Sequence, residues 1–431
     1  MWRLLFKKSK ENRLLKLLTK NFFICYTNIG EDMKKFFICI FTLFIFNISV
    51  NAIDIEITSK EAIIYNLNDD KVIYEKNSNE QTKIASLTKI MTCLVALDNI
   101  NNIDDTVTVD YKDLQGLQGY AVAGFKAGDT VTYKDLLYAL MLPSAADAAN
   151  ILSRNIAGSV DDFVTLMNEK VSNLGLKNTH FSNPIGIDDD NYSTAYDMAI
   201  VLKEAIKSDL FKQLYNTDSY TTSNNIKLTK TTDKIASKYN LDISNLNGSK
   251  TGFTDEAGYC LASTATYNDV NYLAITLNSE KLPNHIKDTL ELYNYFNDNY
   301  SYKEILKDKQ LLKTIKVKDS KTKEYKIISN KTITKYLSND VDINKIEYKY
   351  SGVDTLNRKI KKGDYLGKVK IMHGNDTLDT YKVYLDKDIK YYNYWLLLIP
   401  VGILVFIIWI KIKLKKSKRR IKNPLRKRKK R

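Results

Sequence analysis

The sequence predicts an α+β protein: an antiparallel sheet packed by a cluster of helices, then a small all-β domain and a single membrane-spanning helix. Three observations support this prediction. Apolar residues after Ser86 recur at helical spacing, residues 258–266 and 271–277 are β-type runs joined by a polar turn, and residues 302–386 alternate in polarity between turn signals. A length of 431 residues is enough for two domains with targeting segments at the ends.

The N-terminal region contains a predicted signal peptide at residues 33–52. A basic pair after Met33 precedes an apolar stretch of about fifteen residues, and Val50-x-Ala52 has the small side chains of a cleavage site. The stretch is short for a membrane span, which favours cleavage after Ala52 and export of the rest of the chain. Residues 1–32 are interpreted as an artefact of the assigned gene start, or else as an extra N-terminal extension.

The first domain is predicted at residues 53–298. Two β-rich runs around a turn form a hairpin at residues 62–74, and the helix with Ser86 follows it. The later helices are predicted to end at Leu142, Ile156, Leu174 and about Ile206. Residues 208–245 are polar and are predicted to be irregular. The two β-type runs close the domain.

A β-sandwich-like domain at residues 302–388 and a transmembrane helix at residues 392–412 are predicted to follow. Residues 395–410 are apolar without a polar face, which favours spanning over the alternative of an interfacial helix. The basic tail, residues 413–431, would fix this end on the cytoplasmic side. We therefore expect a single-pass protein of the cell membrane with both folded domains on the cell-wall side.

The positive charge of the chain is concentrated at its two ends. Of the net charge of +16, residues 1–35 carry +6 and residues 411–431 carry +14, so the part between them is slightly acidic. A nucleic-acid partner is therefore not predicted, because the charged ends are explained by a membrane.

The cysteines and histidines form no metal-binding pattern. There is no Cys-x-x-Cys spacing among the four cysteines, and the three histidines form no ligand pattern with one another. Cys93 and Cys260 stand in apolar runs and are predicted to be buried, unpaired thiols. We expect no metal and no cofactor.

The first chemical motif is Ser86-x-x-Lys89 at the start of an apolar helix. Residues three apart lie on one face of a helix, so the Lys89 amine can reach the Ser86 hydroxyl. A serine becomes a nucleophile when a neighbouring base accepts its proton, and a lysine is such a base when burial and nearby positive charge keep it neutral. Ser86 is the predicted acyl-ester nucleophile and Lys89 the general base. The backbone N–H groups of Ser86 and Phe253 are the predicted oxyanion hole.

Two further signals follow in chain order. Ser144 lies between two predicted helices and is the candidate relay of a proton to the leaving amine. Lys250-Thr251-Gly252 precedes the β-type runs. Lys250 and the Thr251 hydroxyl would hold a substrate carboxylate, and Gly252 would allow the substrate backbone to approach closely.

The chain resembles the D-alanyl-D-alanine carboxypeptidases, which are penicillin-binding proteins of low molecular mass. The matching residues lie in segments 85–92, 135–138, 142–144, 178–186, 192–197 and 250–261. The β-rich segment around residues 361–364 resembles the second domain of that family. The resemblance implies a penicillin-binding, serine β-lactamase-like fold for residues 53–298. It also implies removal of the terminal D-alanine from peptidoglycan stem pentapeptides through an acyl-enzyme on the serine, with β-lactam antibiotics as inhibitors.

One position departs from the family pattern. The second motif is usually Ser-x-Asn, and the third residue here is Ala146. Because alanine cannot bond to the substrate amide or help to hold the lysine, we expect reduced or altered turnover. The alternative is a catalytically weakened module that binds peptidoglycan or penicillin. A β-lactamase is disfavoured, because Glu169 and Asn173 have the spacing of its deacylation element but fall inside a predicted helix.

Overall fold

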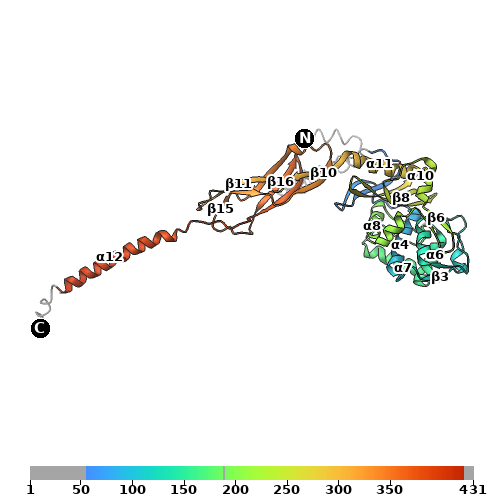
Figure 1. The fold of residues 1–431 in the computed structure, drawn as a ribbon, viewed down its shortest axis with the longest axis horizontal. Helices are drawn as coiled ribbons and strands as arrows, with labels where there is room; N and C mark the ends of the chain where they lie inside the picture. Colours follow the sequence, from blue (N-terminus) through green and yellow to red (C-terminus); the bar gives the residue numbers. More distant parts are fainter. Residues whose placement is uncertain (1–54, 188–189, 422–431) are drawn as a thin grey trace, which may run out of the picture. The chain divides into compact units, whose positions relative to one another are not determined.

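The computed structural model describes residues 55–187 and 190–421 (Figure 1). The predicted signal peptide at residues 33–52 and the segment 1–32 lie outside the described residues.

A five-stranded antiparallel sheet forms the centre of the first domain. Its strands, in order across the sheet, are β2 (Lys71–Lys76), β1 (Glu61–Asn66), β9 (Val270–Ser279), β8 (Gly258–Tyr267) and β7 (Leu246–Thr254). The predicted hairpin and the two predicted β-type runs are confirmed as β1–β2 and β8–β9. β1 is an inner strand and is buried along its whole length, because helices cover the faces of the sheet, and β7 is an edge strand. The free edge of β7 is therefore available to a site.

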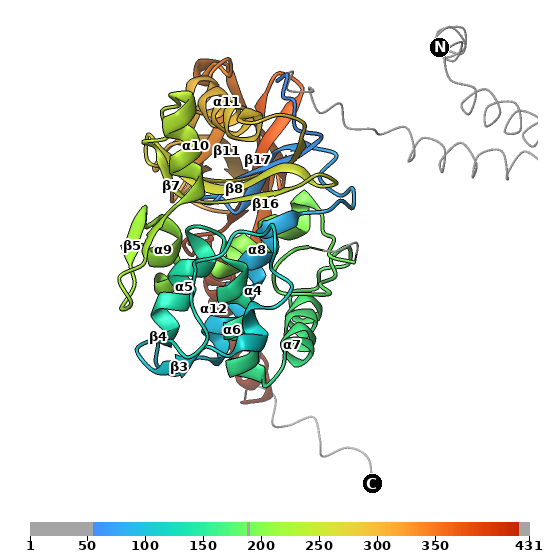
Figure 2. The same cartoon turned by 90° about the vertical axis from the view of Figure 1, so that its right-hand side faces the viewer.

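Helices cover both faces of this sheet (Figure 2). The helices of the domain are η1 (Ala85–Leu87), α4 (Thr88–Asn99), η2 (Tyr111–Leu114), α5 (Tyr133–Met141), α6 (Ala146–Ala157), α7 (Val160–Asn173), α8 (Ala195–Ala205), α9 (Asp209–Asn216), α10 (Thr231–Tyr239) and α11 (Asn284–Asn299). α11 packs on β8 and β9 from one face, and α8 packs on β9 from the other. Two short hairpins complete the domain: β3 (Thr106–Thr108) with β4 (Thr130–Thr132), and β5 (Ser219–Thr221) with β6 (Lys227–Thr229).

The helix boundaries follow local capping chemistry. The side chains of Ser159 and Thr194 accept hydrogen bonds from backbone N–H groups three residues later, which satisfies donors at the starts of α7 and α8. Gly158 ends α6 in the left-handed conformation, with φ of 88°. Glu169 and Asn173 lie within α7, which agrees with the argument against a β-lactamase.

The prediction that residues 208–245 are irregular is wrong. This segment contains α9, β5, β6 and α10, although most of its side chains are polar. α9 buries Phe211, Leu214 and Tyr215 on one face, and those three side chains are enough to dock a short helix. Tertiary packing decides the structure here, because the local pattern is too short to indicate it.

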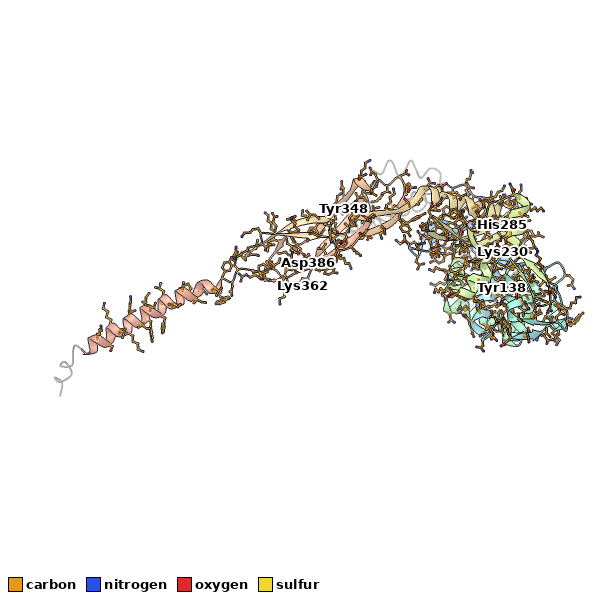
Figure 3. All side chains as sticks on the ribbon, viewed as in Figure 1. Tyr138, Lys230, His285, Tyr348, Lys362 and Asp386 are labelled. Carbon is orange, nitrogen blue, oxygen red and sulfur yellow. The ribbon has the colours of Figure 1, made fainter. Side chains whose placement is uncertain are left out.

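The second domain is all-β, as predicted. Its elements are β10 (Tyr300–Leu306), β11 (Leu311–Val317), β12 (Glu324–Ile328), β13 (Ile333–Ser338), η3 (Ile343–Lys345), β14 (Ile346–Gly352), β15 (Thr355–Leu356), β16 (Tyr365–His373) and β17 (Asp376–Tyr384). They form the sheets β10–β13, β12–β11–β15 and β14–β16–β17 around a core of alternating Ile, Val and Leu side chains. Tyrosine hydroxyls link the strands: Tyr348, labelled in Figure 3, donates to the carbonyl of Ile305 at 2.8 Å.

The C-terminal described element is α12 (Trp395–Ile421). None of the helices in residues 55–187 and 190–421 reaches the length and apolarity that a membrane crossing requires. The transmembrane helix predicted at residues 392–412 is therefore not confirmed by this structure.

Candidate active site

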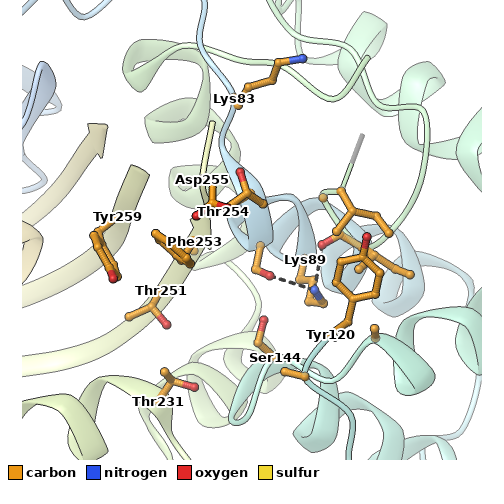
Figure 4. Close-up of a pocket in the computed structure, with 18 of the residues that line it drawn as sticks. Lys83, Lys89, Tyr120, Ser144, Thr231, Thr251, Phe253, Thr254, Asp255 and Tyr259 are labelled. Atoms are coloured by element: carbon orange, nitrogen blue, oxygen red, sulfur yellow. Dashed lines mark hydrogen bonds between the residues drawn. The ribbon is translucent and has the colours of Figure 1, made fainter. Parts of the chain in front are cut away.

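A cavity of about 740 Å³ opens where η1 meets the free edge of β7 (Figure 4). Ser86 and Lys89 of the first motif line this cavity, as do Ser144 and residues 251–253. Residues predicted from three separate motifs thus line one cavity.

The Ser86–Lys89 pair forms as the spacing predicts. The Lys89 Nζ atom lies 3.0 Å from the Ser86 Oγ atom and donates to the carbonyl of Ile185 at 2.7 Å. Lys89 is 1 % exposed. Burial lowers its pKa from 10.5 to about 7, and the charge of Asp147 opposes this change. The amine is therefore available in its neutral form near pH 7.

The backbone of the nucleophile segment is held by close packing. Ala85 has a φ of 46°, which is unfavourable for a non-glycine residue. Gly186 covers it so closely that a Cβ at that position would lie 2.0 Å from the Ala85 carbonyl oxygen. Strained backbone of this kind persists only where its surroundings enforce it, and it is concentrated at functional sites.

Ser144 and Lys250 form a second pair. The Lys250 Nζ atom donates to the Ser144 Oγ atom and to the carbonyl of Thr251, both at 2.8 Å. Burial, and then the charge of Lys89, lowers the pKa of Lys250. Ser144 also has a positive φ of 67°. Because Lys250 is 1 % exposed and is not among the lining residues of the cavity, its ammonium is directed at Ser144 and not at open solvent.

The β7 edge runs directly beside the nucleophile. A Cβ placed on Gly252 would lie 3.1 Å from the Ser86 backbone nitrogen and 2.9 Å from the Ile84 carbonyl, so only glycine allows this approach. The next residue, Phe253, has its side chain 49 % exposed and stacked on Tyr259, with 4.2 Å between ring centroids. The two backbone N–H groups of the predicted oxyanion hole therefore belong to adjacent segments at the cavity edge.

Ala146 lines the cavity as the first residue of α6. Its backbone N–H donates to the carbonyl of Ala121 at 2.7 Å, and its methyl group takes the place of the amide expected at this position. The structure thus confirms that the departure from the motif falls inside the site.

Several residues at the cavity were not identified from the sequence. They belong to irregular segments without a motif: Tyr120, Ile187 and Asn191. Figure 4 shows Tyr120 on the same side of the cavity as Lys89. Within the described ranges, no group of three or more His, Cys, Asp or Glu side chains is placed to hold a metal ion, and Cys93 and Cys260 are buried and unpaired.

Comparisons with known proteins agree on one family. Residues 48–281 match the family model for D-alanyl-D-alanine carboxypeptidase, and residues 300–391 match that for the penicillin-binding protein 5 C-terminal domain. The D-alanyl-D-alanine carboxypeptidase DacF of Bacillus subtilis is 28% identical over 338 residues, covering 77% of this chain and 86% of the relative. A D-alanyl-D-alanine carboxypeptidase of a Streptomyces species is 34% identical over 241 residues, covering 52% and 81%. The fold is similar to that of penicillin binding protein 5 from Haemophilus influenzae, with a TM-score of 0.59 and 23% identity over 78% of this chain and 98% of that one.

Proposed function

Because the chain belongs to the D-alanyl-D-alanine carboxypeptidase family of low-molecular-mass penicillin-binding proteins, we propose that it removes the terminal D-alanine of peptidoglycan stem pentapeptides through an acyl-enzyme on Ser86. It is a serine peptidase of the penicillin-binding type. The assignment of the residues is carried by one observation: the Ser86–Lys89 pair and the Ser144–Lys250 pair meet at a single cavity.

The acylation step begins at Ser86. Neutral Lys89 accepts the hydroxyl proton while the Oγ atom attacks the carbonyl carbon of the D-Ala–D-Ala bond. The resulting oxyanion accepts hydrogen bonds from the backbone N–H groups of Ser86 and Phe253. The proton taken up by Lys89 is then delivered through the Ser144 hydroxyl to the departing D-alanine nitrogen as the C–N bond breaks, so that Lys89 returns to its neutral form and the peptide remains as an ester on Ser86. Water then hydrolyses the ester and regenerates the serine.

The substrate carboxylate is assigned to the β7 side of the cavity. Thr251 lines the cavity and its hydroxyl can donate to the carboxylate, and Gly252 allows the peptide to lie along the strand edge. Lys250 contributes positive potential from behind Ser144 and not a direct contact, because its ammonium already donates to Ser144 and Thr251. The two lysines are coupled, because the charge of Lys89 adds to burial in lowering the pKa of Lys250.

The test is the release of D-alanine from diacetyl-L-Lys-D-Ala-D-Ala by the purified chain, with and without prior treatment with penicillin. We expect release that penicillin abolishes, and a covalent penicillin adduct on the Ser86 peptide by mass spectrometry. An adduct without any release would support the alternative, a module that acylates but does not turn over its peptide. Release that continues in the fully acylated protein would contradict the proposal.

Replacing Ala146 with asparagine should raise turnover. The amide would be added inside the cavity, where it can bond to the substrate and to Lys89. One such polar contact is worth about 1–3 kcal/mol, so we expect kcat/KM to rise by up to roughly a hundredfold. The measurement is kcat/KM for D-alanine release, beside Ala149→Asn on a buried face of α6 that does not line the cavity. No gain with Ala146→Asn would show that Ala146 does not limit catalysis.

We also propose that the chain is exported and that α12 attaches it to the membrane. The support is that apolar side chains from Trp395 to Ile412 are exposed along α12, and that basic residues follow them. The full chain should sediment with membranes and resist carbonate extraction, whereas a chain ending at residue 388 should be released. Recovery of both chains in the soluble fraction would contradict membrane attachment.

A further inference from the structure

A buried carboxylate lies immediately behind the active site, and the proposed reaction does not use it. Asp147 is the second residue of α6, next to Ala146, and is 1 % exposed. It is not one of the residues that line the cavity. An acid buried to this degree requires partners that compensate for its charge.

Those partners are backbone N–H groups of a segment without regular structure. The Asp147 Oδ1 atom accepts from Ala123 at 2.9 Å, and the Oδ2 atom accepts from Ala123 at 3.1 Å and from Gly124 at 3.0 Å. Oδ1 also accepts from the N–H of Ala148 at 2.9 Å. A carboxylate can accept all of these bonds at once, because it has two oxygens and no hydrogen to clash with the donors.

The clamped segment forms one wall of the cavity. Gly119, Tyr120 and Ala121 precede the clamp and line the cavity, and the Ala121 carbonyl accepts a bond from the Ala146 N–H at 2.7 Å. The segment is attached to α6 at these two points, and Phe125, 4 % exposed, anchors its far end in the core. Tyr120 itself is 41 % exposed, so its position depends on the backbone that Asp147 holds.

We propose that Asp147 is a positioning residue of the reaction: by clamping residues 123–124 to α6, it places Tyr120 and Ala121 at the wall of the cavity beside Lys89. This inference rests on the proposed function of the site. This chain has Ala146 in place of the asparagine of the second motif. The hydrogen bonds of Asp147 hold residues 119–121 next to Ala146, so that both form part of the cavity wall that the substrate would contact.

Asp147 acts on Lys89 through charge as well as geometry. Its negative charge raises the pKa of Lys89 against the lowering effect of burial. Lys250 on β7 lies behind Ser144, and the other charged or titratable groups that line the cavity are Lys83, Tyr120, Asp255, Glu256, Tyr259 and His285. Loss of the Asp147 charge should therefore lower the pKa of Lys89. Since the rate rises with pH as Lys89 becomes neutral, this rise (the acidic limb of the plot of kcat/KM against pH) should move to lower pH.

The experiment compares Asp147→Asn and Asp147→Glu in the full chain. The asparagine keeps one acceptor oxygen but turns an NH₂ group toward a backbone donor, so we expect kcat/KM to fall by about 10- to 100-fold. In Asp147→Asn, the acidic limb of kcat/KM against pH should shift to lower pH, and hydrogen exchange of the backbone amides at residues 119–125 should accelerate. Asp147→Glu keeps the negative charge, so it should accelerate amide exchange at residues 119–125 without shifting the acidic limb.

Asp113→Asn is the matched control, because Asp113 is a buried acid paired with Arg154 away from the cavity. It should lower the melting temperature but leave the acidic limb and exchange at residues 119–125 as in the wild type. If the Asp147 variants do not fold, Gly124→Ala loosens the same segment, since its φ of 95° disfavours alanine.

Asp147→Asn with wild-type kcat/KM, pH profile and exchange would overturn the inference, as would an Asp113→Asn variant that reproduces all three changes. Absence of D-alanine release from the wild-type chain would instead count against the proposed function. Amide exchange at residues 119–125 still tests the clamp in that case, so the two failures are distinguishable.

Discussion

Ser86→Ala should abolish D-alanine release and penicillin adduct formation together. The Ser86 hydroxyl lines the cavity and lies 3.0 Å from the Lys89 amine, which is the base assigned to it. Removing a nucleophile removes the covalent route, which is expected to cost at least about 10³-fold in kcat. The measurement is single-turnover and steady-state release of D-alanine, with intact mass after exposure to penicillin.

The fold of this variant should be preserved. The Ser86 side chain is hydrogen-bonded to Lys89 and lies at the cavity, so alanine leaves no void in the core. An unchanged melting temperature and circular dichroism spectrum would verify this. Retained adduct formation at another residue, for example Ser144, would mean that the nucleophile is misassigned. Loss of release with retained adduct on another serine would have the same meaning.

The sequence was sufficient to identify the acylating pair because its geometry is local. Ser86 and Lys89 belong to one helical turn, so their spacing alone brings the two side chains together. The β7–β9 strands could likewise be predicted, since long β-type runs with short turns leave few alternatives. The chain order of the motifs then indicated which elements had to meet.

Contacts between distant segments could not be predicted in the same way. The spacing of Lys250 from Ser144 in the sequence does not reveal that the two bond to each other, so the lysine was expected to face the carboxylate directly. Neither Tyr120 nor Asp147 belongs to a recognisable motif. Their connection, through the backbone N–H of Ala123 that donates to Asp147, is visible only in the tertiary structure. α9 and α10 are missed because short polar helices depend on the surface they dock on.

Lys89→Arg should lower kcat by at least about 10²-fold, because arginine remains protonated and cannot accept the Ser86 proton. In the wild type, burial lowers the pKa of Lys89 to about 7. The neutral base therefore predominates above pH 7 and is lost as the pH falls below it. The rate should rise with pH through about 7 in the wild type, and this limb should be absent in the variant. The measurement is kcat against pH for D-alanine release.

Lys230→Arg is the matched control for this substitution. Lys230 is a buried lysine of the same domain, 5 % exposed and paired with Asp218 at 3.2 Å, and it does not line the cavity. If Lys89→Arg and Lys230→Arg lose stability to a similar degree and only Lys230→Arg keeps the rise of kcat with pH through about 7, this rise is due to the titration of Lys89. A limb that survives in Lys89→Arg would assign the base to another group.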